Sequence, residues 1–326
     1  MRAVTYSRYG GPETHTLEHD VEVPEPGEGE VRVRVAAVGL NPYDWHIYRG
    51  DPWLARFAFG LRSPGSRIVG SDVAGVVDAV GAGVERLAVG DRVCGFVGFG
   101  GAADAVVTKE NRLALVPAGV SDEAAAAVPI PALTALLGLE PLGVEGTRVL
   151  IIGASGGVGH MAVQFARMLG AARVVAVCSG RNAAMVTSLG ADRVIDYTRE
   201  SVLDCGETFD IVFDTVTTTP LRRLRRIMAS DAIYAPAGGV GGGPLLGPAW
   251  GMYRSVVAGW TVSQTVRTVS AREDDTAPEV GRFLDWIAAG DVQVMLERAY
   301  PLEQHAEALA RLETQHVSGK VVLTIP

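Results

Sequence analysis

A glycine-rich turn is the part of this sequence whose residues point most directly to chemistry. Residues 153–159 read Gly-Ala-Ser-Gly-Gly-Val-Gly and follow the apolar run 148–152. Glycines let the backbone pass close to a pyrophosphate, and a following helix offers free N–H groups to phosphate oxygens. Although Ala154 holds the first glycine's place in G-x-G-x-x-G, the turn opens a series of strand–helix units. We therefore predict a dinucleotide site rather than a ligand-free turn. The predicted phosphate contacts are Ser155, Gly156, Gly157 and Val158.

The end of the next apolar run indicates which dinucleotide would bind. An NAD site places an acid roughly 20 residues after the glycines, where it holds the ribose 2′-hydroxyl. This chain has no Asp or Glu between Glu145 and Asp192, and it carries Cys178, Ser179 and Arg181 at that place. A hydroxyl and a guanidinium suit a 2′-phosphate, which an acid would repel. These three residues therefore predict NADPH. The alternative is that Arg181 is only a solvated residue at a helix start.

Two kinds of segment must position these residues. Up to about residue 120 the chain reads as short strands separated by glycine turns, at 31–35, 73–80, 92–96 and 105–107. From Ser121, a candidate helix cap, strands and helices alternate, which indicates a parallel sheet with helices on both faces. The predicted strands are 148–152, 173–177, 210–213 and 232–234, and the predicted helices are 158–169, 183–189 and 220–228. A tail with helices at 283–289 and 305–312 and a strand at 321–325 is too short for a domain and is expected to return to the first one.

Composition excludes several classes of protein. The chain has 326 residues, of which 48% are hydrophobic, and its formal net charge is -8. A folded protein of two domains is expected, and a nucleic-acid or acidic-membrane partner is disfavoured. Three cysteines cannot build a disulfide framework, so we predict a cytoplasmic setting. No signal-peptide core is evident, and the apolar run 124–139 contains prolines and is too short to span a membrane comfortably.

Longer motifs resemble a known family. They are GASGGVGHMAVQFARMLGA from Gly153, SLGAD at 188–192, IDY at 195–197, GSDVAGVV at 70–77, GDRV at 90–93 and SGKVVL at 318–323. Together they are similar to the medium-chain dehydrogenase/reductase superfamily along nearly the whole chain. The resemblance implies a GroES-like β-barrel catalytic domain over 1–121, a Rossmann NADPH-binding domain with a doubly wound parallel sheet over 122–264, and a return segment, 265–326. It also implies an α/β fold with the active site in the cleft between the domains.

Two metal-binding positions of this superfamily carry other residues here. Zinc alcohol dehydrogenases have a cysteine two residues after a glycine, and later a Gly-His-Glu. The corresponding segments are Gly39-Leu40-Asn41 and Gly70-Ser71-Asp72, so an amide and a hydroxyl replace two ligands of the metal. A structural zinc lobe would need four cysteines after the GDRV segment, where only Cys94 stands. We therefore predict no metal.

The zinc-free members that this chain resembles are the quinone oxidoreductases. Their signature Gly-x-Asn-x-x-Asp is seen as Gly39 to Asp44. By resemblance, Asn41, Tyr43 and Asp44 line the nicotinamide cleft. The other cofactor contacts that the resemblance implies are Thr134 and the run Gly238, Gly239 and Val240 at the nicotinamide, Thr215 at the ribose, Tyr197 at the adenosine 2′-phosphate and Lys320 near the phosphates. A homodimer is implied through a sheet edge whose last strand would be 255–262.

The resemblance implies a reductase that transfers hydride from NADPH to a quinone or an α,β-unsaturated carbonyl, which is electrophilic without a Lewis acid. Asn41 and Tyr43 are candidate donors to the negative charge that develops on the acceptor oxygen, and Tyr43 or water could supply the final proton. The structural alternatives are a packed aromatic for Tyr43, a turn residue for Asn41 and an acceptor of backbone N–H groups for Asp44.

Two other functions stay open from the sequence. An enoyl-thioester reductase would need a basic path for a carrier phosphate, which Arg56, Arg62 and Arg67 could supply. These arginines lie in the aromatic segment 48–67, which would form either a wall of the cleft or a surface loop. A non-catalytic NADPH-binding protein is the second alternative.

Overall fold

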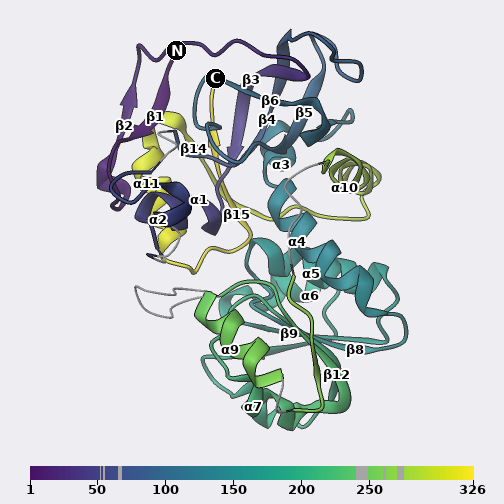
Figure 1. Cartoon of the computed structure of the whole chain (residues 1–326). Coiled ribbons are helices and arrows are strands. Elements are labelled where there is room, and N and C mark those ends of the chain that lie inside the picture. Colours follow the sequence, from purple (N-terminus) through teal and green to yellow (C-terminus); the bar gives the residue numbers. More distant parts are fainter. Residues whose placement is uncertain (52, 54–55, 65–67, 240–248, 260–261, 270–274) are drawn as a thin grey trace. The chain divides into compact units, whose positions relative to one another are not determined.

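The chain divides into two compact units in the computed structural model (Figure 1). The first unit comprises Met1–Ile130 and Arg272–Pro326, and the second comprises Pro131–Ala271. The structure describes residues 1–51, 53, 56–64, 68–239, 249–259, 262–269 and 275–326. Among these residues, no helix has the length and apolar character needed to cross a membrane.

The first unit is built around one long strand, β3 (Glu30–Gly39). Its alternating valines are buried. It forms antiparallel pairs with three strands, β4, β6 and β15. The full path is β14-β15-β3-β4-β5-β7, with β6 on β3, and β1 pairs separately with β2. The other strands are β1 (Ala3–Tyr6), β2 (His15–Glu18), β4 (Asp72–Val80), β5 (Arg92–Phe96), β6 (Ala105–Lys109), β7 (Leu113–Leu115), β14 (Leu296–Pro301) and β15 (Lys320–Thr324).

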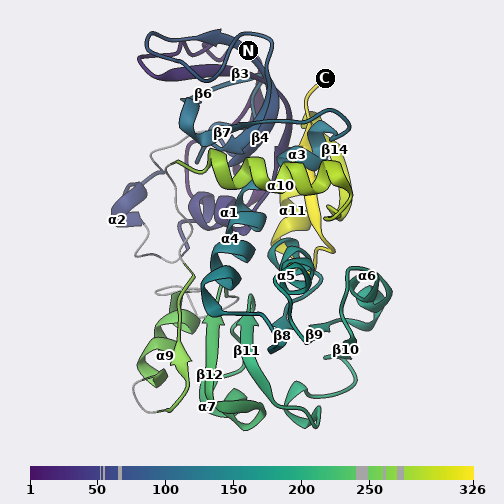
Figure 2. The same cartoon turned by 90° about the vertical axis from the view of Figure 1, so that its right-hand side faces the viewer.

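Helices of the first unit cover this sheet and complete its core. The helix α3 (Asp122–Ala126) packs on β3 and β4, and the Ser121 hydroxyl accepts a hydrogen bond from the Ala124 N–H at its start. The helix α10 (Ala277–Ala289) packs on β5 and β7 and ends at Gly290 in the left-handed region (Figure 2). The helix α11 (His305–Glu313) lies against α1 (Pro42–Arg49) and β15. A short helix, α2 (Arg56–Phe59), completes the described set.

The second unit is a parallel sheet in the order β10-β9-β8-β11-β12-β13. Its strands are β8 (Arg148–Ile152), β9 (Arg173–Cys178), β10 (Arg193–Asp196), β11 (Phe209–Asp214), β12 (Met228–Pro236) and β13 (Thr265–Val266). The helices are α4 (Pro129–Leu139), which begins at the end of the first unit, α5 (Gly157–Met168), α6 (Ala183–Ser188), α7 (Leu221–Leu224) and α9 (Ala249–Gly259). Helices α5 and α6 pack on β8, β9 and β10, and α7 and α9 pack together. The predicted fold class is therefore confirmed.

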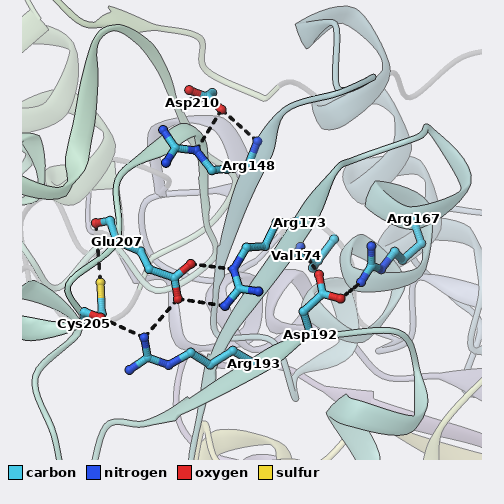
Figure 3. A network of polar contacts seen from close by, with 9 residues as sticks. All are labelled: Arg148, Arg167, Arg173, Val174, Asp192, Arg193, Cys205, Glu207 and Asp210. Carbon is cyan, nitrogen blue, oxygen red and sulfur yellow. Dashed lines mark hydrogen bonds and ion pairs between the residues drawn. The ribbon is translucent and has the colours of Figure 1, made fainter.

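A network of polar contacts joins the amino ends of four neighbouring strands, β10, β9, β8 and β11 (Figure 3). Glu207, which precedes β11, accepts hydrogen bonds from Arg173 at the start of β9 and from Arg193 at the start of β10. Asp210 accepts from the backbone of Arg148 at the start of β8. These contacts lie at the amino edge of the sheet, whereas the glycine turn follows the carboxyl end of β8. The network therefore serves sheet assembly, and a ligand site is expected at the opposite, carboxyl edge of the sheet.

The limits of the two compact units differ from the predicted domain bounds, and one predicted strand needs correction. The first unit runs to Ile130, past the predicted bound at 121, and α3 packs on β3 and β4. The second unit runs to Ala271, past the predicted bound at 264, and β13 pairs with β12. The expected last strand at 255–262 is wrong: residues up to Gly259 belong to α9, in which Ser255 is buried while Val256 and Val257 are each 36% exposed. The two valines favour a strand by residue type, but the packing of one face of α9 against the protein makes this segment helical.

Candidate active site

Five buried residues of the first unit form a polar cluster: Asn41, Asp44, Ser71, Asp72 and Lys320. Each has at most 4% of its surface exposed. Asn41 precedes α1, Ser71 and Asp72 lead into β4, and Lys320 begins β15. The pairing of β3 with both β4 and β15 brings these three segments together. The cluster therefore follows from the sheet register, and Lys320 is 279 residues from Asn41 along the chain.

The side-chain amide of Asn41 is the centre of this cluster. Its Nδ2 donates to Asp72 Oδ2 at 2.8 Å and also reaches Ser71 Oγ and the Gly39 carbonyl at 3.2 Å. Its Oδ1 accepts from Lys320 Nζ at 2.6 Å. In this structure the amide of Asn41 therefore makes its hydrogen bonds to protein groups, and its donation to a substrate oxygen stays a prediction.

Asp44 fixes the start of α1 rather than facing outwards. Its Oδ2 accepts the Asn41 backbone N–H at 2.7 Å, and it also bonds to the Ser71 hydroxyl and the Gly70 backbone. Burial raises the pKa of Asp44 to about 6, although these hydrogen bonds and the charge of Lys320 oppose the rise. The structure thus places Asp44 in the structural role that the sequence left open, as an acceptor of backbone N–H groups.

Lys320 lies inside the first unit with 3% of its surface exposed. Its ammonium donates to the Leu40 carbonyl at 2.7 Å and to Asn41. Burial lowers the pKa of Lys320, while the charges of Asp72 and Asp44 raise it. The ammonium is directed to protein oxygens here, and the contact of Lys320 with the cofactor phosphates stays a prediction.

The cluster does not suit a zinc ion. Zinc in proteins is held by thiolate, imidazole or carboxylate groups. Here an amide and a hydroxyl accompany the two carboxylates, and an ammonium ion already neutralises part of their charge. Within the described ranges, no group of three or more His, Cys, Asp or Glu side chains could hold a metal.

Tyr43 is the third predicted catalytic residue. It is half-buried in the first turn of α1, and its ring packs edge-on against Phe96 at a centroid distance of 5.6 Å and lies tilted against Phe99 at 5.9 Å. A phenol held between aromatic rings has a fixed direction, and its hydroxyl can donate a hydrogen bond.

The glycine turn of the second unit forms a cradle that a larger residue would fill. Gly153 has φ +83°, and an added Cβ would lie 2.2 Å from Thr215 Oγ1. A Cβ on Gly159 would lie 2.1 Å from the Gly153 carbonyl oxygen. At Gly156 it would lie 3.5 Å from that oxygen, an ordinary contact. Residues 155–158 are partly exposed at the start of α5. The turn is therefore closely packed on the protein side and accessible on the other, as a dinucleotide pyrophosphate requires.

The predicted adenosine end lies after β9. Cys178 is buried, Ser179 is half-buried, and Arg181 is exposed in the short turn Gly180–Asn182. Tyr197 follows β10 and is 53% exposed. The parallel pairing of β10 with β9 sets Asp196 opposite Cys178, which brings the end of β10 to the same edge of the sheet.

Sequence reasoning missed one acid at this edge, Asp196. An added Cβ on Gly180 would lie 2.3 Å from its Oδ2. Its carboxylate accepts from the Thr198 hydroxyl and N–H and from the Gly180 backbone, and the Thr198 bonds hold its pKa below the usual range. Asp196 ends β10, the next parallel strand along the chain, so its position directly after an apolar run is the sequence signal for it.

The residues predicted to hold the nicotinamide and its ribose include Thr215, Gly238, Gly239 and Thr134. The Thr215 hydroxyl donates to the Ile152 carbonyl at 2.9 Å, so Thr215 lies at the carboxyl edge beside the glycine turn. Gly238 approaches the same region, since its Cβ would lie 2.8 Å from the Thr215 carbonyl oxygen, and Gly239 is half-buried. Thr134 is buried in α4. Val240 lies outside the described residues.

The basic path suggested for a carrier phosphate receives little support. The guanidinium of Arg56 lies over the Tyr9 ring, with its Cζ 4.4 Å from the ring centroid. It also donates hydrogen bonds to the carbonyls of Gly50 and Arg49. It therefore serves to hold the aromatic segment together. Arg62 is exposed, and Arg67 lies outside the described residues.

Comparison with known proteins agrees with this geometry. Residues 27–118 match the family described as alcohol dehydrogenase GroES-like domain, and residues 189–323 match zinc-binding dehydrogenase. The NADPH-dependent alkenal/one oxidoreductase of Arabidopsis thaliana is 31% identical over 99% of this chain and 79% of its own length. A quinone oxidoreductase of Pseudomonas aeruginosa is 31% identical over 99% of both chains. The quinone oxidoreductase structure from Coxiella burnetii has a TM-score of 0.86 and 25% identity, and the match covers 100% of this chain and 99% of that one. The chain therefore belongs to the medium-chain dehydrogenase/reductase superfamily, among the homologues of the quinone oxidoreductases.

Proposed function

We propose that this protein is a zinc-independent, NADPH-dependent reductase of quinones and α,β-unsaturated carbonyls. The observation that carries the proposal is the composition of the polar cluster. By resemblance, Asn41 and Ser71 stand where zinc-dependent members carry metal ligands, and an ammonium ion lies beside them. These side chains are not a set of zinc ligands that could polarise an unactivated alcohol or ketone. The names of the relatives from Arabidopsis and Pseudomonas support the same class of acceptor.

The second unit would bind the cofactor through the carboxyl edge of its sheet. The backbone N–H groups of Gly156, Gly157 and Val158 would meet the pyrophosphate at the start of α5. Ser179, Arg181 and Tyr197 would bind the adenosine 2′-phosphate. The Ser179 hydroxyl and the Arg181 guanidinium support the preference for NADPH, and the nearby Asp196 carboxylate accepts hydrogen bonds from Thr198 and Gly180.

The protein's own groups have a limited chemical role in this proposal. Bound NADPH supplies the hydride. Thr134, Thr215, Gly238 and Gly239 would hold the nicotinamide and its ribose. Tyr43 Oη would donate a hydrogen bond to the acceptor oxygen as negative charge develops there, and it can pass its proton on to that oxygen.

An acceptor panel tests the proposal. NADPH oxidation is followed with a quinone, an enone, a saturated ketone and an enoyl thioester, each at the same concentration. We expect turnover with the first two and much slower turnover with the others. Preference for the enoyl thioester would replace this function, and NADPH binding without turnover of any acceptor would make the protein a non-catalytic binder.

The setting of the protein is also proposed. Three free, buried cysteines suit a reducing compartment such as the cytoplasm. A homodimer would use the exposed edge of the second sheet at β13, and light scattering after size exclusion measures the mass directly.

A further inference from the structure

Lysine is rare in this chain, and one of its two lysines is buried. Only Lys109 and Lys320 occur among 29 basic residues, the others being arginines. Lys109 is exposed at the end of β6, whereas Lys320 has 3% of its surface exposed at the start of β15. An ammonium is a compact charge with three donors, while a guanidinium is a planar fork. The buried position therefore suits a small, point-like cation.

The charges around Lys320 explain why a cation is needed there. Asp44 and Asp72 are both buried, and the charge of Lys320 lowers the pKa of each carboxyl against the effect of burial. Two buried carboxylates without a cation would be costly. The two carboxylates and the Lys320 ammonium together carry a formal charge equal to that of one carboxylate. If the ammonium were removed, the two carboxylates would carry their full charge.

The contacts of Lys320 also determine how Asn41 is oriented. An amide can turn by half a rotation, and its hydrogen bonds decide between the two states. Because Lys320 Nζ can only donate, Asn41 Oδ1 must face it, and Nδ2 must then face Asp72 and Ser71. The same ammonium donates to the Leu40 carbonyl, one residue before Asn41. Lys320 thus holds the two residues that lead into α1, in whose first turn Tyr43 lies.

We propose that Lys320 is a positioning residue, a buried cation that holds Asn41 and the start of α1 and thereby directs Tyr43. The inference rests on the proposed function only for its kinetic readout. The spectroscopic and stability readouts stand without it.

The state of the ammonium can be observed directly because the chain has two lysines. In protein labelled with ¹⁵N-lysine, we expect the Lys320 ammonium to give a signal at neutral pH with protons that exchange slowly with water. The exposed Lys109 should exchange fast, and Lys109→Arg assigns the two residues. A Lys320 signal that exchanges as fast as that of Lys109 would overturn the buried, hydrogen-bonded cation.

Three variants separate charge balance from positioning: Lys320→Met, Asp72→Asn and the two combined. Lys320→Met should lower the Tm by about 10 °C, because it leaves the carboxylates without their cation. The combined variant restores the formal charge and should regain most of this loss. Its kcat should nevertheless stay roughly tenfold to a hundredfold below wild type, because the Leu40 carbonyl and Asn41 still lack their donor. Its affinity for NADPH should stay within about twofold, since the proposal places Lys320 on protein oxygens.

Each contrary outcome has a distinct meaning. If the Tm losses of Lys320→Met and Asp72→Asn add in the combined variant, Lys320 contributes by packing and not by balancing charge. Full recovery of kcat in the combined variant would show that Lys320 has no positioning role. A large loss of NADPH affinity with unchanged kcat would assign Lys320 to the cofactor phosphates. Lys109→Met is the matched control and should change none of these values. If Lys320→Met does not fold, the combined variant carries the test. If the wild type reduces neither quinone nor enone, the proposed function fails while the Tm and ammonium measurements still decide this inference.

Discussion

Gly156 and Gly159 lie three residues apart at the start of α5, and replacing each by alanine should have different consequences. In Gly159→Ala, the new Cβ would lie 2.1 Å from the Gly153 carbonyl oxygen and 2.8 Å from the Ala154 Cα. Both neighbours are backbone atoms of the turn and cannot rotate away. In Gly156→Ala, the Gly153 oxygen at 3.5 Å is the sole described neighbour within 4 Å. The first glycine therefore has room within the protein, and the second does not.

The magnitudes follow from these distances. Relief of the Gly159→Ala overlap requires the helix and turn to separate by roughly 1 Å, and such overpacking costs about 1–3 kcal/mol, of which the better helix propensity of alanine offsets at most about 1. A net loss of about 2 kcal/mol lowers the Tm by roughly 4–8 °C. Gly156→Ala should change stability by less than about 0.5 kcal/mol. If its methyl group displaces a phosphate from one backbone N–H, the lost charged hydrogen bond of about 1.5–3 kcal/mol weakens NADPH binding by roughly 10- to 150-fold.

The assay is thermal unfolding without ligand, together with titration of NADPH against intrinsic fluorescence. We expect Gly156→Ala to keep the wild-type Tm and lose affinity, and Gly159→Ala to lose both. Equal Tm losses in the two variants would refute the contact geometry. Wild-type affinity in Gly156→Ala would refute the placement of the pyrophosphate.

Three further predictions concern single side chains. Arg181→Asp should weaken NADPH at least about tenfold more than NADH, because a carboxylate repels the 2′-phosphate, and equal effects in a titration of both cofactors would defeat this assignment. Tyr43→Phe should lower kcat by about ten- to a thousandfold with little change in the Kd for NADPH, whereas unchanged turnover would leave Tyr43 a packing residue. Asp44→Asn should flatten part of the pH dependence of the Tm. Burial raises the folded-state pKa of Asp44 from 3.8 to about 6, so the folded state binds more protons between these values and its stability falls as the pH rises through them. A variant whose Tm profile between pH 4 and pH 6 matches wild type would contradict this.

Local patterns predicted the second unit well. The apolar run 148–152, the glycine turn and the helix after it lie next to one another in sequence, so their periodicity and turn chemistry contain most of the information. The helix α9 was missed for the opposite reason. Its Ser-Val-Val segment has the residue types of a strand, and only contact with α7 and β13 makes one helical face preferable.

The polar cluster shows what the sequence could not predict. Asn41, Asp44 and Lys320 were identified as functional residues, but their partners depend on the pairing of β15 with β3 across the whole chain. Once that pairing is known, the ammonium is seen to donate to the amide, a contact that no local pattern predicts. Asp196 was missed for a similar reason, because it comes beside Gly180 only through the register of β10 with β9.

The central claim is that this protein transfers hydride to an activated acceptor without a metal. The most direct measurement is mass spectrometry of the product formed from an enone and NADPH deuterated at the transferred position, after exhaustive treatment of the protein with a chelator. We predict a saturated ketone with deuterium at the carbon β to the carbonyl, formed at the rate of untreated protein. A product without deuterium, or activity that disappears with the chelator and returns with zinc, would contradict the account.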